Sequence, residues 1–185
     1  MKNAWIDGEP DVVDESVFTK GCQLGFHSWN GWSPEREFCE GAAEIVGQLD
    51  PEVIIETGVG QGFTTRRVHE ALPENSTYLA FEADPRMYSQ IPTGDFPAIQ
   101  FCEGHPTAQD YESADLVIFD SLGKLRRGEM RLWASSAQKN SYILCHDADL
   151  SRPGTPHHRN AKLIQRLKLR GVWTPNPRGG FFGQR

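Results

Sequence analysis

Short runs of consecutive apolar residues recur along the chain, separated by segments in which apolar side chains return every three or four positions. An uninterrupted apolar run is typical of a strand buried on both faces of a parallel sheet, whereas the three-and-four spacing is typical of a helix with one buried face. The apolar runs predict strands at residues 53–55, 77–81, 98–102, 116–119 and 142–145.

The helical spacing predicts helices between these strands. The first opens with Ser33 as its N-cap and Pro34 at its first position, where proline's missing N–H group costs nothing, and it runs to residue 49. Further helices are predicted at residues 63–72, 86–90, 129–137 and 160–169. Two short extended segments follow the last helix, one around Trp173 and one around Phe181 and Phe182.

This alternation predicts an α/β fold, with a doubly wound, mostly parallel sheet and helices on both of its faces. The connection from the third strand to the fourth, residues 103–114, is too short for a full crossover helix, so one crossover helix is expected to be shortened. A shortened helix would leave part of one sheet face uncovered. A partner subunit could cover it, so a homo-oligomer remains an alternative.

An acidic residue stands at or near the end of every predicted strand. A sheet does not need such a row for its stability, and open parallel sheets bind ligands beyond the carboxyl ends of their strands. The row therefore predicts a binding site at that edge, and its members are Glu56, Glu82, Glu103, Asp120 and Asp147.

Composition restricts the class of protein further. The 185 residues, 38% hydrophobic and 24% charged, suit one globular domain. No apolar run reaches the ~18 residues of a membrane span, and the acidic amino terminus lacks the apolar core of a signal peptide. The net charge of −6 argues against a grip on the nucleic-acid backbone. Four scattered cysteines without a C-x-x-C pair predict a reduced, cytoplasmic protein.

The glycines of the stretch VIIETGVGQGFTT, residues 53–65, occupy every second position, at Gly58, Gly60 and Gly62. A glycine loop between a strand and a helix lets backbone amides meet a ligand at contact distance, although such a loop can also be a plain tight turn. The dinucleotide pattern G-x-G-x-x-G is not met, because Phe63 stands at its third glycine position.

The pattern E-x-G-x-G-x-G resembles motif I of the class I S-adenosyl-L-methionine-dependent methyltransferases. The stretches ADLVIFDS and YILCHDA resemble the fourth-strand and fifth-strand motifs of their small-molecule, catechol O-methyltransferase-like group. The resemblance implies a seven-stranded sheet with an antiparallel strand near its edge in residues 33–185, preceded by a lid or arm in residues 1–32. It implies methyl transfer to a small-molecule acceptor, with oxygen as the expected target. A non-catalytic cofactor-binding module and a nicotinamide-dependent oxidoreductase remain the alternatives.

The resemblance also implies which residues hold the cofactor. Glu56 would suit the cationic sulfonium and amino group, and Glu82 would accept hydrogen bonds from both ribose hydroxyls. The family's third-strand motif, usually Gly-Asp-Ala, here reads Gly104-His105-Pro106, so either Glu103 or His105 is expected to replace the aspartate that meets the adenine amine.

Two residues at the ends of the fourth and fifth strands are the candidates for catalysis. His146 is the preferred base, and Asp120 either orients it or touches the cofactor's amino group. The alternative for His146 is a structural histidine that bonds a backbone carbonyl.

Acceptor contacts are expected from two segments. Trp29 and Trp32 belong to an aromatic stretch that could close over the site or instead pack on the sheet edge or on a second subunit. Arg152 and His157 lie in the loop after the fifth strand, which could grip an acidic acceptor or be a surface loop.

A Mg²⁺ site is conceivable from three acids, Asp120, Asp147 and Asp149. Metal-dependent members of the family place an Asp-Asn pair after the fifth strand, whereas this chain has Asp147 followed by Ala148. Because that asparagine is missing, no metal is expected.

Overall fold

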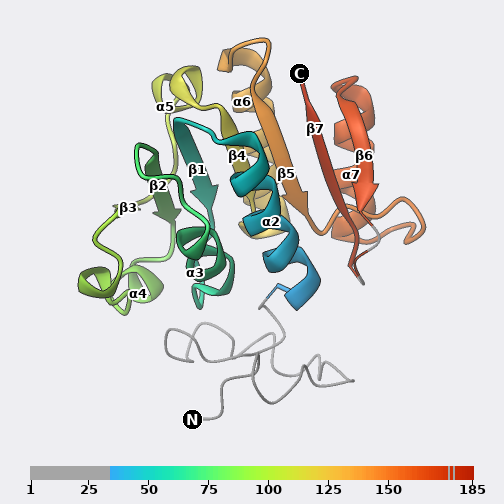
Figure 1. Cartoon of the computed structure of the whole chain (residues 1–185). Helices are drawn as coiled ribbons and strands as arrows, with labels where there is room; N and C mark the ends of the chain where they lie inside the picture. The colour runs from blue at the N-terminus through green and yellow to red at the C-terminus, as the bar shows by residue number, and fades with distance from the viewer. Residues whose placement is uncertain (1–33, 175, 177) are drawn as a thin grey trace.

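The computed structural model describes residues 34–174, 176 and 178–185 (Figure 1). The predicted lid of residues 1–32, the N-cap Ser33 and the aromatic residues Trp29 and Trp32 lie outside the described residues.

The described strands form one seven-stranded sheet in the order β3-β2-β1-β4-β5-β7-β6. β1 to β5 pair in parallel, and β7 pairs antiparallel with both of its neighbours. The predicted fold class is therefore confirmed, including the antiparallel strand next to the edge. The strands are β1 (Val53–Thr57), β2 (Thr77–Glu82), β3 (Ile99–Glu103), β4 (Leu116–Phe119), β5 (Tyr142–His146), β6 (Arg170–Thr174) and β7 (Gly180–Gln184).

Helices cover both faces of the sheet (Figure 1). One face carries α2 (Arg36–Leu49) and α3 (Phe63–Glu70), and the other carries α5 (Ala108–Ser113), α6 (Gly123–Ser136) and α7 (Pro156–Arg166). The connection from β2 to β3 contains the short α4 (Pro85–Tyr88) and the 3-10 turn η3 (Thr93–Asp95). At six residues, α5 is the shortened crossover helix that the sequence predicts.

Alternate strand residues point into two separate cores. In β1, Ile54 packs with residues of α2 and α3, whereas Ile55 packs with residues of α6 and α7. Successive side chains of a strand point to opposite faces, so a fully apolar strand supplies both cores at once. This accounts for the uninterrupted apolar runs.

Three helices begin two or more residues away from their predicted starts. α2 begins at Arg36 after Glu35, so Pro34 precedes the helix instead of opening it, and the Glu35 side chain makes no capping hydrogen bond to α2. α6 begins at Gly123, well before the predicted residue 129, and α7 begins at Pro156 after its N-cap Thr155. The first turns of α6 bury Arg126 and not an apolar side chain, so the apolar spacing did not reveal them.

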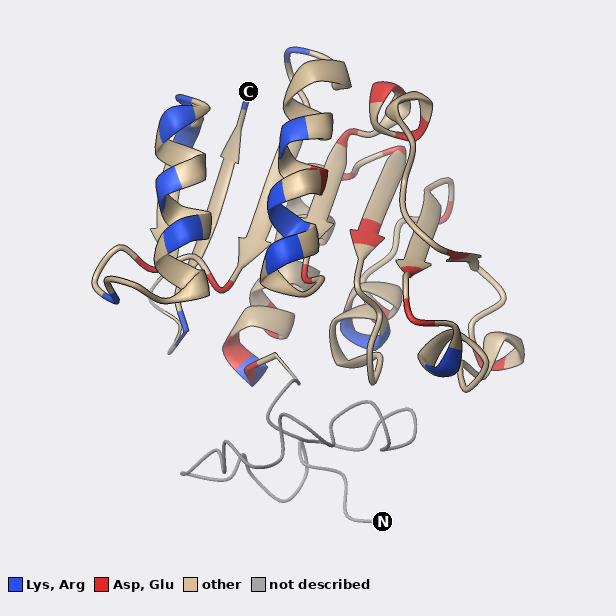
Figure 2. Cartoon of the chain, turned by 180° about the vertical axis from the view of Figure 1, so that it is seen from behind, with Lys and Arg blue, Asp and Glu red and all other residues tan. Residues whose placement is uncertain are grey.

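Charged residues are distributed unevenly over the fold (Figure 2). Lys and Arg gather along α6 and α7, where Arg159, Lys162 and Arg166 form an exposed helix face. Acids gather at the carboxyl ends of the strands. Across the part of the chain that the structure describes, no helix has the length and apolar character needed to cross a membrane.

Candidate functional site

Two adjoining cavities lie at the carboxyl edge of the sheet, where the strand order switches between β1 and β4. The larger has a volume of about 370 Å³ and the smaller about 270 Å³. They share a short piece of wall, the residues Asp120, Ser121 and Leu122 that follow β4.

The glycine loop forms part of the wall of the larger cavity. Gly58 has φ +83°, and a Cβ atom at this position would lie 2.5 Å from Cα of Ser121. Only glycine therefore allows the end of β1 to touch the segment after β4. Gly60 and Gly62 also have positive φ, and Gly62 is the N-cap of α3. All three glycines therefore adopt a positive φ, and Gly58 also allows the backbone to approach Ser121 closely.

Glu82 lies on the wall of the same cavity, at the end of β2. Its Oε2 accepts a hydrogen bond from the backbone N of Gly60 at 2.8 Å, and its Oε1 accepts one from the N of Asp84 at 2.8 Å. Burial raises its pKa, and these two backbone bonds oppose the shift. A carboxylate has about four lone-pair positions, so each oxygen can accept one further hydrogen bond. Glu82 can therefore still bind a pair of hydroxyl groups.

Glu56 does not line the cavity, unlike its predicted position against a cofactor. It is fully buried, and its Oε2 accepts hydrogen bonds from Thr65 Oγ1 and the Tyr78 hydroxyl. Burial raises the pKa of Glu56 to about 8, so the group is largely protonated at neutral pH. A neutral, buried acid gives little attraction to a cation. Its position suits a role in joining β1, α3 and β2 beneath the loop.

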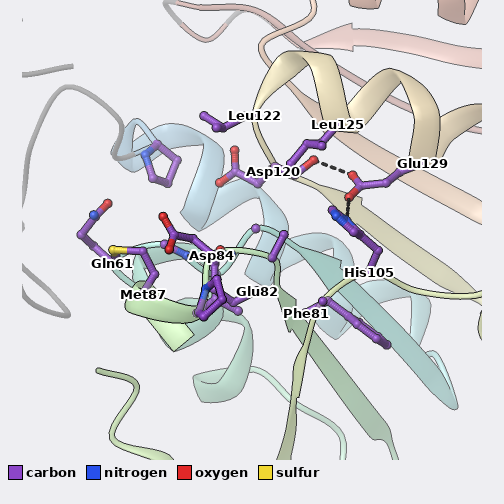
Figure 3. A pocket seen from close by; sticks show the side chains of 18 residues that line it. Gln61, Phe81, Glu82, Asp84, Met87, His105, Asp120, Leu122, Leu125 and Glu129 are labelled. Carbon is purple, nitrogen blue, oxygen red and sulfur yellow. Dashed lines mark hydrogen bonds and ion pairs between the residues drawn. The ribbon is translucent and has the colours of Figure 1, made fainter. Parts of the chain in front are cut away.

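The residues at the end of β3 and directly after it differ in their access to the larger cavity. Gly104 and His105 line it, whereas the exposed Glu103 does not. His105 Nδ1 lies 3.0 Å from Oε1 of Glu129, an acid of α6 that also lines the cavity (Figure 3). The other oxygen of Glu129 accepts a hydrogen bond from Ser121 Oγ. The structure thus brings His105 next to a carboxylate that the sequence analysis missed.

His146 and Asp120 are in direct contact, with 2.6 Å between Nδ1 of the imidazole and Oδ1 of the carboxylate. On the other side of the ring, Nε2 lies 2.5 Å from Oε2 of Glu35. Glu35 precedes α2, and its Oε1 accepts hydrogen bonds at 2.9 Å from both the backbone N and Nε of Arg178. These contacts tie the start of α2 to β5 and to the loop before β7.

The surroundings of His146 bear on its predicted role as a base. The side chain is 1% exposed and lines neither cavity. Burial lowers its pKa, but the carboxylates of Asp147 and Asp120 more than offset that effect and raise the pKa to about 9. With that pKa the ring is protonated at neutral pH, and each of its nitrogens faces a carboxylate, Nδ1 that of Asp120 and Nε2 that of Glu35.

The smaller cavity is lined by residues of the segments after β4 and β5, of α6 and α7, and of the loop before β7. His157 and Asn160 of α7 line it, together with Asp147, Arg126 and Arg178. His157 Nε2 lies 3.6 Å from Oδ1 of Asp147. Burial lowers the pKa of His157, and the attraction of Asp147 does not reverse the shift, so the ring is neutral at pH 7.

Two residues of the loop after β5 that the sequence analysis placed in the site, Arg152 and Asp149, line neither cavity. Arg152 lines neither cavity and pairs with Asp149, at 3.2 Å between Nε and Oδ2. Asp149 is further held by Ser151, whose N and Oγ donate to Oδ1 at 2.7 Å. Within the described residues, no group of three His, Cys, Asp or Glu side chains is placed to hold a metal ion. Asp120, Asp147 and Asp149, the three acids of the conceivable Mg²⁺ site, are accordingly not placed as such a group among the described residues.

Four site residues were not found from the sequence: Glu35, Arg126, Glu129 and Arg178. Each is a charged residue that lies within a helix, directly before a helix or in a turn. Charged side chains at such positions are usually exposed to solvent. A charged residue on the expected buried face of a helix would have been the available signal, and within the predicted helix of residues 129–137 it applies to Glu129.

No protein-family model matches the chain, and no curated protein matches it. Solved structures do match over nearly the whole chain. A putative O-methyltransferase from Klebsiella pneumoniae aligns with a TM-score of 0.64 at 15% identity, covering 98% of this chain and 94% of that one. An O-methyltransferase from Bacillus cereus, solved in complex with SAH (S-adenosylhomocysteine), aligns with a TM-score of 0.65 at 13% identity, covering 99% and 96%.

A third neighbour is the O-methyltransferase TomG from Streptomyces achromogenes, involved in tomaymycin synthesis and solved in complex with SAM (S-adenosylmethionine). It aligns with a TM-score of 0.63 at 11% identity, covering 98% of this chain and 94% of that one. At such identities the likeness shows the fold. The chain has the fold of the SAM-dependent O-methyltransferases, which confirms the predicted resemblance at that level.

Proposed function

We propose that this protein is an enzyme that transfers a methyl group from SAM to an oxygen atom of a small molecule. The observation that carries the proposal is the pair of cavities that meet at Asp120, Ser121 and Leu122. A transferase must hold donor and acceptor side by side, because most of its rate comes from positioning the two reacting atoms.

The larger cavity suits the cofactor in size and chemistry. Its volume of about 370 Å³ falls in the range of small-molecule sites. The loop at Gly58 and Gly60 offers backbone without side chains, and Glu82 keeps two free acceptor positions for ribose hydroxyls. Asp120, on the shared wall, is an anion that suits the amino group of SAM.

The adenine is proposed to lie at the His105 end of the cavity. An exocyclic amine donates hydrogen bonds, and the buried carboxylate of Glu129 is an acceptor at that end. Leu122 and Leu125 supply apolar wall for a flat ring. In this arrangement Glu129, not Glu103, replaces the missing third-strand aspartate.

The smaller cavity is proposed to take the acceptor. Bound SAM supplies an electrophilic methyl group, whose transfer leaves the S–C bond electrons on sulfur while the acceptor hydroxyl gives up its proton. We assign His157 as the acceptor of that proton, in place of His146. His157 lines this cavity, is neutral at pH 7 and lies beside Asp147, which can stabilise the imidazolium once it forms.

Calorimetry with SAM, SAH and NAD tests the cofactor half of the proposal. We expect binding of both sulfur compounds and none of NAD, with Glu82→Ala strongly weakened. Glu103→Ala is the matched control, because it removes an acid from the neighbouring strand end that does not line the cavity. Absence of SAM and SAH binding in the folded wild-type protein would refute the proposal.

Methyl transfer from labelled SAM across a panel of phenols, catechols and hydroxy acids tests the acceptor half. His157→Asn is expected to lower kcat about a hundredfold or more for the best acceptor, while SAH binding stays unchanged. A protein that binds SAM tightly but methylates nothing in a broad panel would instead be the non-catalytic binding module.

A further inference from the structure

Arg126 is a charged side chain in the interior of the protein. It belongs to the first turn of α6, and its side chain is 2% exposed. Its guanidinium lies between the carboxyl ends of two neighbouring parallel strands, β4 and β5, on the wall of the smaller cavity. An arginine is seldom buried unless acids and hydrogen-bond acceptors surround it.

The guanidinium bridges the two strand-end acids. Its NH1 lies 3.3 Å from Oδ2 of Asp147, and its NH2 lies 3.5 Å from Oδ1 of Asp120. The same two nitrogens donate hydrogen bonds to backbone carbonyls, NH1 to His146 and NH2 to Ser121. Each strand end thus contributes one carboxylate and one carbonyl oxygen to a single cation.

Carboxylates and carbonyls are also the ligands that a hard divalent cation prefers. In the catechol O-methyltransferase-like group that the sequence resembles, metal-dependent members hold such an ion at the ends of the corresponding strands. Here the residues do not fit a metal, because Ala148 supplies no side-chain oxygen and the guanidinium already occupies the space between Asp120 and Asp147.

We propose that Arg126 takes the place of a divalent metal ion in this protein. The side chain supplies a permanent positive charge between the two aspartates, and the site does not take up Mg²⁺. A further consequence rests on the proposed function. An acceptor oxygen in the smaller cavity would meet the guanidinium of Arg126, a cation that belongs to the chain and cannot dissociate.

Mn²⁺, a spectroscopic substitute for Mg²⁺, tests the proposal without any cofactor or acceptor. Electron paramagnetic resonance of free Mn²⁺ is expected to show no saturable site on the wild-type protein below about 1 mM. Arg126→Gln keeps a polar side chain but removes the positive charge that lies between the carboxylates of Asp120 and Asp147. This variant is expected to gain a saturable Mn²⁺ site with a Kd at least about tenfold below that limit.

Two further variants make the result specific. Adding Asp147→Asn to Arg126→Gln removes one carboxylate and is expected to abolish the gained binding. Arg131→Gln is the matched control, because Arg131 is an exposed arginine of the same helix and should leave the protein like the wild type.

Either of two results would overturn the proposal. One is a saturable Mn²⁺ site in the wild-type protein that Asp147→Asn removes, and this test stands even if Arg126→Gln does not fold. The other is a folded Arg126→Gln protein with no gain in Mn²⁺ binding. A failure of the proposed function is a separate result, since it would appear as absent SAM and SAH binding, which none of these titrations measures.

Discussion

The imidazole of His146 bonds the carboxylate of Asp120 through Nδ1, at 2.6 Å, although 26 residues separate them in the chain. The opposite ring nitrogen contacts Glu35, 111 residues away. The ring is thus held between two acids, and it also packs on Phe38, with 4.3 Å between the ring centroids. Two residues chosen as a catalytic pair form the centre of an ion-pair network that holds the strand ends to α2.

This network predicts a loss of stability at alkaline pH. The folded-state pKa of His146, about 9, lies above the value of 6.5 expected in the unfolded chain. The contribution is fully present below pH 6.5 and is lost as the pH rises through 9, on the order of 2–3 kcal/mol of unfolding free energy. Urea unfolding at pH 6.5 and 9.5 measures the change.

His146→Gln is the control for that measurement, because Glu56 also titrates at about pH 8 and contributes a loss in the same direction. The gap in stability between the wild type and His146→Gln should narrow as the pH rises. A gap of constant size would show that His146 does not carry the effect.

The two glutamates of the cofactor region should differ in their effect on SAH affinity. Glu82→Gln weakens an acceptor on the cavity wall and is expected to lower affinity about tenfold to a hundredfold. Glu56→Gln, behind the loop, should change affinity less than about threefold, because a neutral amide replaces an acid that is already largely protonated. Calorimetry with SAH distinguishes the two, and an equal loss would return Glu56 to the cofactor-contacting role predicted from the motif.

The glycines of the loop should differ in their tolerance of alanine. At Gly58 a Cβ atom would lie 2.5 Å from Cα of Ser121, whereas at Gly60 it would meet no atom within 4 Å. Both positions have positive φ, so both variants are expected to carry about 1–2 kcal/mol of strain. Gly58→Ala should lose about 2 kcal/mol more than Gly60→Ala in urea unfolding. Equal losses would mean that the ends of β1 and β4 can move apart at little cost.

Adenine recognition by Glu129 can be measured with S-inosylhomocysteine, in which a carbonyl replaces the exocyclic amine. The wild type should prefer SAH over this analogue by about tenfold to a hundredfold, because a carboxylate repels the added acceptor. Glu129→Gln should reduce that ratio at least about fivefold. If both ligands lose affinity equally, Glu129 supports the cavity without reading the base.

The sequence was sufficient for the fold and for the edge that carries the site. Apolar runs and helical spacing report local backbone conformation and burial, and those two properties largely set an alternating α/β sheet. The glycine loop and Glu82 were found for the same reason, since a close backbone approach and a strand end are local features. The starts of α6 and α7 were missed where polar residues, Arg126 among them, hid the pattern.

The sequence by itself determined which side chains stand at the carboxyl ends of the strands. Only the tertiary structure decided their protonation states and their neighbours. Glu56 is buried and largely neutral, and His146 is protonated between two acids. Arg126 lies between Asp120 and Asp147. The pKa of a side chain depends on burial and on charges brought near by folding. Arg178 and Glu35 meet across 143 residues of chain, and no local pattern records such a contact.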